Sequence, residues 1–128
     1  MKIEEAVTGI QHIGIPTNDK AKTVAFFQSL GFETIWERDD DEWNIAFLRL
    51  KNVVIETYQN GQATGKPGAV DHIALDVSDI EEAYKAVTAK GYSILEDGIQ
   101  FLPFFENGVR FFTVMGPDHE KVEFNQKL

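Results

Sequence analysis

Two stretches of the sequence, residues 9–32 (GIQHIGIPTNDKAKTVAFFQSLGF) and residues 69–92 (AVDHIALDVSDIEEAYKAVTAKGY), align with each other without a gap. The alignment superimposes five pairs of residues: His12 and His72, Ile13 and Ile73, Asp19 and Asp79, Gly31 and Gly91, Phe32 and Tyr92. Internal similarity of this kind is the sequence signature of a repeated structural unit. The chain is therefore interpreted as two copies of one module.

Each copy predicts a strand, a helix and a second strand, in that order. Residues 10–15 and 70–77 alternate in the manner of half-buried strands. The residues that can cap the following helix are Asn18 or Asp19 in the first copy and Ser78 or Asp79 in the second. Apolar stripes at helical spacing come next: Val24, Phe27 and Leu30, then Ile80, Ala83, Tyr84 and Val87. A glycine, Gly31 or Gly91, stands where each helix should end.

Further strands are predicted after each helix. They cover residues 33–38, 44–50 and 53–58 in the first half and residues 93–95, 109–115 and 122–125 in the second. A tight turn at Lys51-Asn52 joins two of them, and residues 116–119 make a longer turn. Each half therefore has the order βαβββ, and the expected fold is of the α+β class, with both modules forming a curved mixed sheet around a cleft.

The two modules are expected to form one domain, residues 1–128. Module one covers residues 8–59 and module two residues 69–126, and the glycine-rich segment 60–68 is the natural linker between them. A half of about 60 residues is marginal as an independent domain, whereas 128 residues fit one compact domain.

Composition and charge exclude several classes of protein. The chain has 21 Asp and Glu against 12 Lys and Arg, a net charge of −9, and no cysteine. Nucleic acids and anionic membranes are therefore not expected as partners, because both are bound by basic patches. Disulfides, thiolate metal sites and a cysteine nucleophile are excluded. No apolar run approaches the roughly 18–20 residues of a transmembrane helix, and residues 1–10 lack the features of a signal peptide, so a soluble cytoplasmic protein is expected.

Two histidines and two glutamates stand at matching places in the two modules. His12 and His72 lie in the first predicted strands, and Glu56 (in VVIETY) and Glu123 (in KVEFNQ) lie in the last. A strand glutamate that faces inward needs a partner, because burying an unpaired carboxylate is very costly. A single such residue is more often structural or solvent-facing. The joint pattern, however, would let a pseudo-twofold arrangement bring all four side chains to one point, so we predict a shared site.

Two imidazoles and two carboxylates suit a divalent first-row metal ion: Zn, Ni, Co, Mn or Fe. Structural zinc sites more often use a closed, cysteine-rich tetrahedron, so we expect coordination positions that stay open to substrate. A metal ion there would act as a Lewis acid toward substrate oxygens. A glutamate in or beside the first shell could move a proton on a carbon next to a carbonyl group.

Four motifs, QHIGIPTND, VVIETY, DHIALDV and GPDHEKVEF, resemble in sequence and order those of the vicinal oxygen chelate superfamily, also called the glyoxalase, bleomycin-resistance and dioxygenase family. The resemblance covers nearly the whole chain, and the complete His-Glu-His-Glu set is most similar to glyoxalase I, lactoylglutathione lyase. It implies His12, Glu56, His72 and Glu123 as metal ligands, with Glu123 or Glu56 as the catalytic base. It also implies a homodimer, in which each site lies within one chain or is shared between two.

The activity implied by this resemblance is that of a metal-dependent lyase or isomerase. Its substrate would be a small 2-oxo compound or its thiol adduct, in which a proton moves between adjacent carbons through a metal-bound enediolate. Relatives that use glutathione carry an arginine four residues after the first histidine, where this chain has Pro16, so glutathione as the thiol stays open. Asn60, four residues after Glu56, matches a polar substrate-binding position of the family.

Two alternative functions stay open. Methylmalonyl-CoA epimerase has related motifs, although its second metal position is usually Gln, and Glu56 here favours glyoxalase I. Antibiotic-binding members of the family sequester a small molecule without chemistry and generally lack the complete ligand set. Extradiol dioxygenases need only two histidines and one carboxylate and are usually longer.

Other residues are candidates for contacts with the substrate. The aromatic segment 101–112 (FLPFFENGVRFF) is predicted to be a loop that enters a strand. It could be a lid in which Phe104 helps to exclude water and Arg110 grips an acidic group, or its aromatics could pack in the core or a dimer interface. Trp43 and Phe47 could line a substrate pocket or pack in the core.

Three further features have simple interpretations. The acidic run 39–42 is expected to be a solvated turn, and His119 is expected to be exposed in the turn of residues 116–119. Lys121 shares a strand face with Glu123 by period-two counting. It could touch an anionic ligand or pair with a nearby acid.

Overall fold

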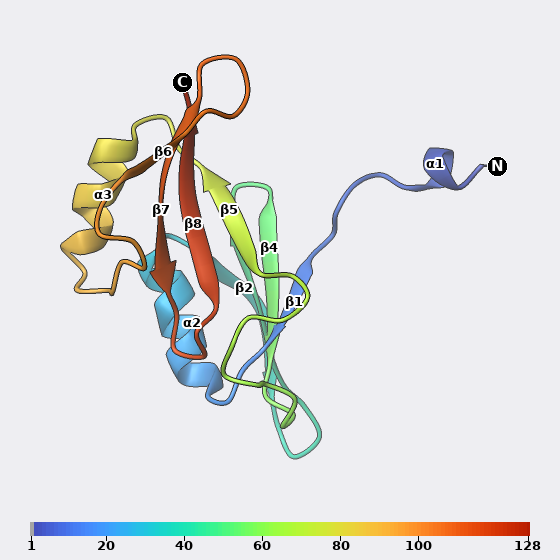
Figure 1. Cartoon of the computed structure of the whole chain (residues 1–128). Coiled ribbons are helices and arrows are strands. Elements are labelled where there is room, and N and C mark those ends of the chain that lie inside the picture. Colours follow the sequence, from blue (N-terminus) through green and yellow to red (C-terminus); the bar gives the residue numbers. More distant parts are fainter. Residues whose placement is uncertain (1) are drawn as a thin grey trace. The chain divides into compact units, whose positions relative to one another are not determined.

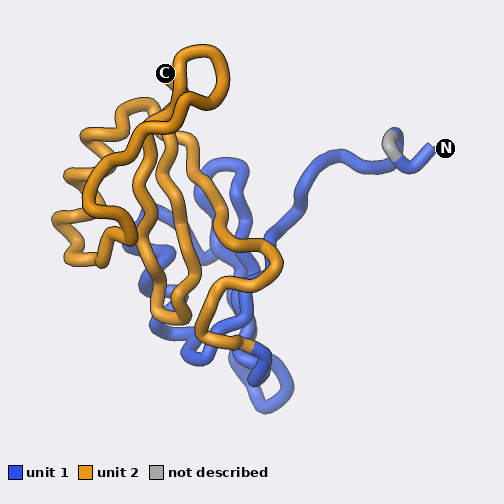
Figure 2. Tube along the Cα trace, viewed as in Figure 1, with its two compact units in different colours: residues 1–62 blue, residues 63–128 orange. Residues whose placement is uncertain are grey.

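The computed structural model of the chain describes residues 2–128, apart from the side chain of Glu4. It divides into two compact units, Met1–Gln62 and Ala63–Leu128 (Figure 2). The boundary between the units falls inside the predicted linker, residues 60–68. That both units form one domain, residues 1–128, stays a prediction.

Unit 1 holds a four-stranded mixed sheet and a helix that packs on β3, β2 and β4 (Figure 1). Its elements are α1 (Ile3–Ala6), β1 (Ile13–Pro16), α2 (Lys20–Ser29), β2 (Glu33–Asp39), β3 (Asn44–Leu50) and β4 (Val53–Tyr58). The strand order is β1-β4-β3-β2. β1 runs parallel to β4, and the other neighbours are antiparallel.

Unit 2 repeats this arrangement, with its helix packed on β8 and β7 (Figure 1). Its elements are β5 (His72–Asp76), α3 (Ile80–Thr88), β6 (Gln100–Leu102), β7 (Val109–Met115) and β8 (Lys121–Lys127). The order β5-β8-β7-β6 again puts the first strand parallel to the last. The predicted fold class is therefore confirmed: an α+β chain of two βαβββ modules, each with a mixed sheet.

The two helices begin in the same way. Asp19 and Asp79 are the N-caps, as predicted, and their side chains accept hydrogen bonds from backbone N–H groups of the first turn. The backbone N–H of the first residue of each helix is bound by a glutamine that follows or ends the last strand. Lys20 N donates to Gln59 Oε1 and Ile80 N donates to Gln126 Oε1, both at 2.9 Å. Each glutamine comes from the end of its module's last strand, so each helix is tied to its own sheet.

The core of each unit lies between the helix and one face of the sheet. In unit 2 the predicted stripe is confirmed: Ile80 and Val87 are buried, and the ring of Tyr84 meets the edge of the Phe112 ring at 5.1 Å between centroids. In unit 1 the predicted stripe is shifted, because Thr23 and Phe26 are buried beside Phe27. Complete burial of a side chain such as Phe27 or Phe112 stabilises the fold by roughly 2–3 kcal/mol.

Strand alternation decides where the two strand glutamates point. Ile55 and Thr57, which flank Glu56, are fully buried, and Val122 and Phe124, which flank Glu123, are buried as well. Successive side chains of a strand point to opposite faces. Both glutamates therefore lie on the face of their sheet that carries no helix, called here the open face.

The first strand of each module is shorter than the sequence predicted. β1 begins at Ile13, so His12 lies just before the strand and not within it, and β5 covers only His72–Asp76. At the other end of the chain, β8 reaches Lys127, two residues beyond the predicted limit. The short helix α1 was not predicted and lies at the end of an extended segment (Figure 1).

The second strand of module two is the largest correction. Residues 93–95 form no strand, and Ile94 makes only an isolated bridge with Val114. The third strand at that edge is β6, within the segment expected to be a loop. The physical reason is a side chain: Glu96 Oε1 accepts the backbone N–H of Thr113 at 2.7 Å, where a neighbouring strand would otherwise bind.

Glu120, in the turn between β7 and β8, makes the stability of the fold depend on pH. Burial raises the pKa of its carboxyl group above the ordinary value of 4.5. Within residues 2–128 its Oε2 is buried without a hydrogen-bond partner, although Oε1 accepts the N–H of Asp118 at 3.0 Å. A raised folded-state pKa stabilises the fold below the unfolded-state pKa, and this contribution is lost as the pH rises through the folded-state pKa.

We therefore expect Glu120→Gln, which cannot ionise, to become more stable relative to the parent protein as the pH rises from about 4 to about 7. Urea denaturation across this range measures the difference in the free energy of unfolding. Glu42→Gln, at an exposed position, is the control and should show no such trend. Parallel curves for Glu120→Gln and the parent would show that ionising this buried carboxyl costs nothing.

Candidate metal and substrate site

His12 and Glu56 face each other on the open face of unit 1. Parallel pairing of β1 with β4 sets Gly14 opposite Glu56, and His12 stands just before β1. His12 Nε2 lies 3.5 Å from Glu56 Oε1, and the two side chains are 34% and 23% exposed. Gly14 has no side chain to fill this space, because even a Cβ there would lie 3.7 Å from Glu56 Oε1. We call these two residues the first His–Glu pair.

His72 and Glu123 form the second His–Glu pair, on the open face of unit 2. β5 runs parallel to β8 and sets Ala74 opposite Glu123. His72 Nε2 lies 3.7 Å from Glu123 Oε1, with side chains 43% and 16% exposed. The two pairs therefore have the same construction, from the first and last strands of their own modules.

The outer nitrogen of each histidine is held by the side chain of the preceding residue. His12 Nδ1 donates to Gln11 Oε1 at 3.0 Å, and His72 Nδ1 donates to Asp71 Oδ2 at 2.9 Å. Because both acceptors are oxygens, the proton sits on Nδ1 and the lone pair of Nε2 faces the glutamate. Histidines that bind metals almost always have their other ring nitrogen held in this way.

The spacing within each pair fits two ligands of one metal ion. Nitrogen and oxygen ligands about 2.1 Å from a tetrahedral ion stand roughly 3.4 Å apart. At the right angles of a five- or six-coordinate site they stand roughly 3.0 Å apart. The measured separations of 3.5 and 3.7 Å are somewhat longer than both values and are long for a hydrogen bond. Each half-open pair could therefore supply one nitrogen and one oxygen to a metal ion.

The four predicted ligands are placed as two pairs, one in each unit. No group of three or more His, Asp or Glu side chains within residues 2–128 is arranged to hold a metal ion. The convergence of both pairs on one ion stays a prediction.

Asp71 ties the second pair to Lys121. The hydrogen bond from His72, and then that from Lys121 Nζ at 3.1 Å, hold the pKa of the Asp71 carboxyl below its ordinary value. Lys121 thus pairs with a nearby acid, one of its two expected roles. The charged form of Asp71 is the one that can accept the His72 Nδ1–H, so this ion pair helps to orient the imidazole.

Aromatic side chains adjoin the first pair. Phe47 is the register partner of both Glu56 and Trp36, and its ring meets the His12 imidazole edge to face at 5.4 Å. The ring centroids of Trp36 and Phe47 lie 6.0 Å apart, and Trp36 is 54% exposed. Sequence reasoning missed Trp36. That Trp36 lies beside Phe47 follows only from the pairing of β2 with β3, and a shift in register between Thr34 and Trp36 hides this pairing from sequence analysis.

Two of the predicted substrate residues lie at the end of the unit 1 sheet. Trp43 is 45% exposed, so it does not pack in the core. Its backbone N–H donates to Asp40 Oδ1 in the turn before β3. The acidic run 39–42 is that turn, and Arg38 pairs there with Asp40. Asn60 follows β4 and is bonded locally: its side chain donates to Gln62 Oε1 and accepts from Gln62 N.

The structure does not bring Arg110 to the second pair. Arg110 is the register partner of Gln126, which lies on the helix side of the unit 2 sheet, whereas Glu123 lies on the open face. Its guanidinium bonds Glu81 Oε1 at 3.3 Å. Phe104 is 54% exposed in the loop between β6 and β7.

Two residues missed by sequence reasoning stand beside Glu123. Asn125 Nδ2 donates to Glu123 Oε2 at 3.0 Å, which leaves Oε1 facing His72. Glu96 Oε2 accepts the hydroxyl of Thr113, the register partner of Glu123, at 2.9 Å. Continuing the alignment of residues 9–32 with 69–92 by four residues offers a signal for Glu96, because it then falls on Trp36 and the two differ in type at one place in the repeat.

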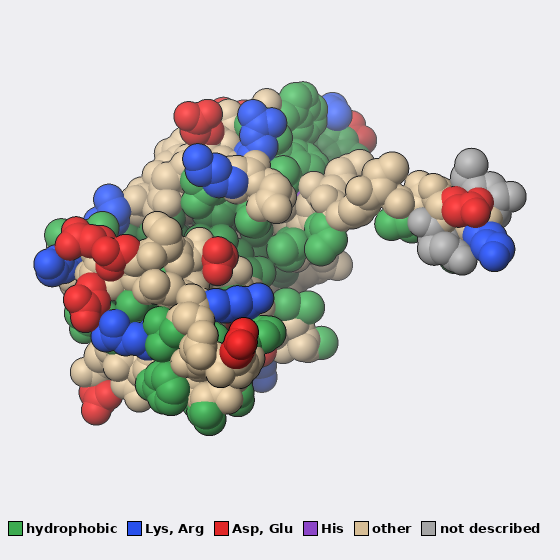
Figure 3. Space-filling view, turned by 90° about the horizontal axis from the view of Figure 1, so that it is seen from above, with side chains coloured by type: hydrophobic (Ala, Val, Ile, Leu, Met, Phe, Trp, Pro, Cys, Tyr) green, Lys and Arg blue, Asp and Glu red, His purple; other side chains and the backbone are tan. Residues whose placement is uncertain are grey.

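The surface carries no concentrated basic patch on the side seen in Figure 3, where acidic and basic side chains are interspersed. His119 is exposed, as expected, and its Nδ1 donates to the carbonyl of Gly65. None of the helices in residues 2–128 is both long and apolar enough to span a membrane.

The influence of Lys121 on Asp71 can be measured directly. We expect Lys121→Met to raise the pKa of the Asp71 carboxyl toward its ordinary value, because the variant lacks the ammonium that stabilises the charged form. A carbon-detected NMR titration of the Asp71 side chain measures this pKa. Lys90→Met, an exposed position at the end of α3, is the control and should leave it unchanged. An unaltered midpoint in Lys121→Met would remove the proposed tie between the two residues.

Among solved structures, a member of the glyoxalase/bleomycin resistance protein/dioxygenase superfamily from Sphaerobacter thermophilus is similar in fold, with a TM-score of 0.78 and 21% identity over 95% of this chain and 99% of that one. So is the fosfomycin resistance protein FosX of Listeria monocytogenes in complex with Mn(II) and a sulfate ion. Its TM-score is 0.73, with 19% identity over 95% of this chain and 94% of that one.

Sequence comparison gives the family. An uncharacterised protein of Bacillus subtilis, YwbC, is 30% identical over 92% of this chain and 97% of its own length. The family model of the Glyoxalase/Bleomycin resistance protein/Dioxygenase superfamily matches residues 9–124, which include both His–Glu pairs. The chain therefore belongs to the glyoxalase/bleomycin resistance protein/dioxygenase superfamily.

Proposed function

We propose that the protein is a cytoplasmic metal-dependent lyase or isomerase of the glyoxalase I type. The observation that carries this proposal is the repeated construction of the two His–Glu pairs. In each pair an imidazole nitrogen faces a carboxylate oxygen at 3.5 or 3.7 Å, and the outer ring nitrogen is held by the preceding side chain. A single His–Glu pair can be structural, whereas the same construction at matching places in both modules is what two halves of one metal site would require.

The proposed ligands of the metal ion are His12, Glu56, His72 and Glu123. Their nitrogen and carboxylate donors suit Zn, Ni, Co, Mn or Fe, and the Mn(II) ion in the FosX complex supports a divalent ion in this fold. The ion would supply Lewis-acid stabilisation of negative charge on substrate oxygens. Each pair belongs to one unit, so the full set requires both units, from one chain or from two chains of a homodimer.

The proton is proposed to be moved by Glu56. Glu123 has one oxygen held by Asn125, whereas Glu56 accepts no hydrogen bond from other residues within the described chain and keeps both oxygens available. The Phe47 and Trp36 rings beside the first pair would exclude water from the reacting carbon. Glu56 would take a proton from one carbon of a small 2-oxo compound or its thiol adduct and return it to the neighbouring carbon.

Pro16 separates this protein from relatives that hold glutathione through an arginine at that place. Pro16 lies in β1, opposite Tyr58, and offers no cation to a carboxylate. We therefore expect a thiol adduct that is recognised elsewhere. An epimerase acting on a CoA thioester and a non-catalytic binder of small molecules are the alternatives to the lyase, and the experiments below test the lyase against them.

The metal site is tested by binding. We expect Zn or Ni to bind the parent protein, and His12→Ala and His72→Ala each to weaken binding by at least about tenfold, because each removes one ligand. Isothermal titration calorimetry on metal-free protein measures this. His119→Ala is the matched control, since His119 bonds only the Gly65 carbonyl among the described contacts. Equal affinities in all four proteins would end the metalloenzyme proposal.

The two glutamates are expected to differ in the metal-loaded enzyme. Glu56→Gln should keep part of the metal affinity through its amide oxygen but lose about 100-fold or more in turnover of methylglyoxal with thiols, because a general base is removed. Glu123→Gln should chiefly weaken metal binding. Thioester formation and metal affinity are measured on the same samples. If the parent binds metal and ligands but turns over no adduct, the lyase proposal is wrong and one of the two alternatives, the epimerase or the binder, replaces it.

A further inference from the structure

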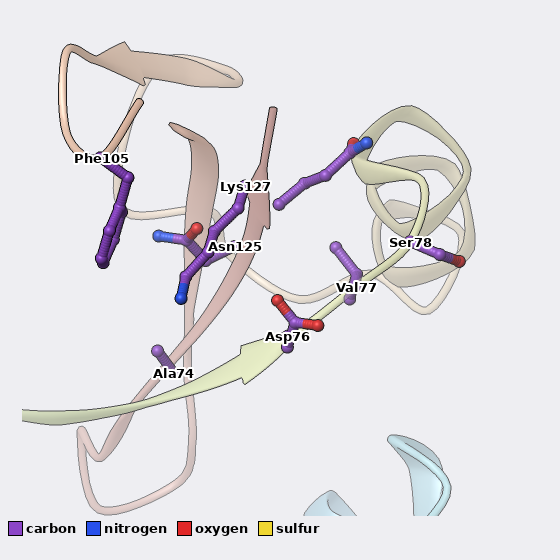
Figure 4. A pocket seen from close by; sticks show the side chains of 8 residues that line it. Ala74, Asp76, Val77, Ser78, Phe105, Asn125 and Lys127 are labelled. Carbon is purple, nitrogen blue, oxygen red and sulfur yellow. The ribbon is translucent and has the colours of Figure 1, made fainter. Parts of the chain in front are cut away.

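An open pocket lies beside the second His–Glu pair, entirely within unit 2 (Figure 4). Its walls come from β5, β8, the start of the loop before α3, and the loop between β6 and β7. Its lining includes Ala74, Asp76, Phe105, Asn125 and Lys127. None of the four proposed metal ligands lines it, so it is a separate space next to the pair.

The pocket lies next to Glu123 along the sheet. Ala74 is the register partner of Glu123, and its small side chain leaves the way open along the sheet. Asn125 donates to Glu123 Oε2 and also lines the pocket, so one amide touches both. A ligand whose reacting end lies at the second pair would therefore extend its remainder over Asn125.

Two opposite charges stand further along. Asp76 is the register partner of Asn125, and Lys127 follows two residues later on the same face of β8. Figure 4 draws the ends of Asp76 and Lys127 in the same hollow. Yet neither makes an ion pair with the other, nor with any residue of the described chain. Both charges are therefore available to a ligand.

Phe105 holds the cation in place. Lys127 Nζ lies 4.2 Å from the centroid of the Phe105 ring, a cation–π contact. Phe105 has φ 60, a left-handed backbone conformation that a bulky side chain rarely adopts, and its ring is largely exposed. In the same loop Gly108 has φ 89, and a Cβ there would collide with the Phe101 ring.

We propose that this pocket binds the tail of the substrate, and that the tail carries an ammonium group and a carboxylate, as an amino-acid thiol does. The ammonium group faces Asp76, and the carboxylate faces Lys127 and the amide of Asn125. Lys127 lies four residues beyond Glu123 on β8, about 13 Å along the strand, which a bare three-carbon compound cannot span and which therefore favours a longer substrate such as a thiol adduct. The assignment of the pocket to the substrate rests on the proposed function.

Three unreactive thioethers test the pocket without any catalysis. S-methyl-L-cysteine carries both charges, 2-(methylthio)ethylamine only the ammonium group and 3-(methylthio)propanoate only the carboxylate. Each is titrated into metal-free protein and followed by the backbone NMR signals of residues 74–78 and 125–127. We expect S-methyl-L-cysteine to shift these signals and to bind about fivefold more tightly than either truncated probe. Because no metal ion or turnover is involved, this result is independent of the lyase proposal.

Two variants assign the charges. Lys127→Gln should weaken S-methyl-L-cysteine and the carboxylate probe but not the amine, and Asp76→Asn should weaken S-methyl-L-cysteine and the amine but not the carboxylate. Lys90→Gln and Asp41→Asn change the same charges at exposed positions outside the pocket and should leave all three affinities unchanged. Equal affinity of the three probes, absence of shifts in these signals, or equal losses in the control variants would overturn the proposal.

Discussion

The arrangement of each module depends on the parallel pairing of its first strand with its last. A parallel pair needs a crossover connection, and α2 and α3 supply it within their modules. The pairing brings a histidine from the start of the module beside a glutamate from its end, at 3.5 Å in one unit and 3.7 Å in the other. Gln59 and Gln126 then fix each helix to the same last strand, so the helix covers one face and leaves the glutamate on the other. A change in this pairing by one residue would turn Glu56 or Glu123 into the core.

Much of this could be predicted from the repeat. The alignment of residues 9–32 with 69–92 predicted both helix caps, both helix-ending glycines and the matching histidines, because these depend on residue type and local spacing. Glu56 and Glu123 lie outside the aligned stretches and were predicted from their matching places in the last strand of each module. The route of the chain after Gly91 could not be predicted in this way. There the Glu96 carboxylate occupies the N–H of Thr113, and the edge strand forms later, at β6. A side chain that replaces a strand leaves no periodic signal.

Substrate residues were harder to predict, because parity along a strand decides what a side chain can reach. Arg110 lies within the aromatic segment 101–112, but its register partner Gln126 lies on the helix side of the sheet, and its guanidinium bonds Glu81. Lys127 is one residue further along β8 than Gln126 and therefore shares the face of Glu123. Trp36 and Asn125 adjoin the two His–Glu pairs because each shares a sheet face with the glutamate of its module. Their places follow from sheet register, which the sequence specifies only through the packing of the whole module.

The two open faces carry the same His–Glu pair and differ in the side chains that surround it. Unit 1 surrounds its pair with Phe47 and Trp36, which carry no charge, and its Glu56 keeps both oxygens free of other donors within the described chain. Unit 2 surrounds its pair with polar groups, among them Asp71, Lys121 and Asn125. A carboxylate that no amide or ammonium group holds is suited to moving a proton. A face lined by fixed charges is suited to recognising a charged ligand. The duplicated frame thus supplies one His–Glu pair twice, and the proposed function uses the difference between its copies, with chemistry at the first pair and recognition beside the second.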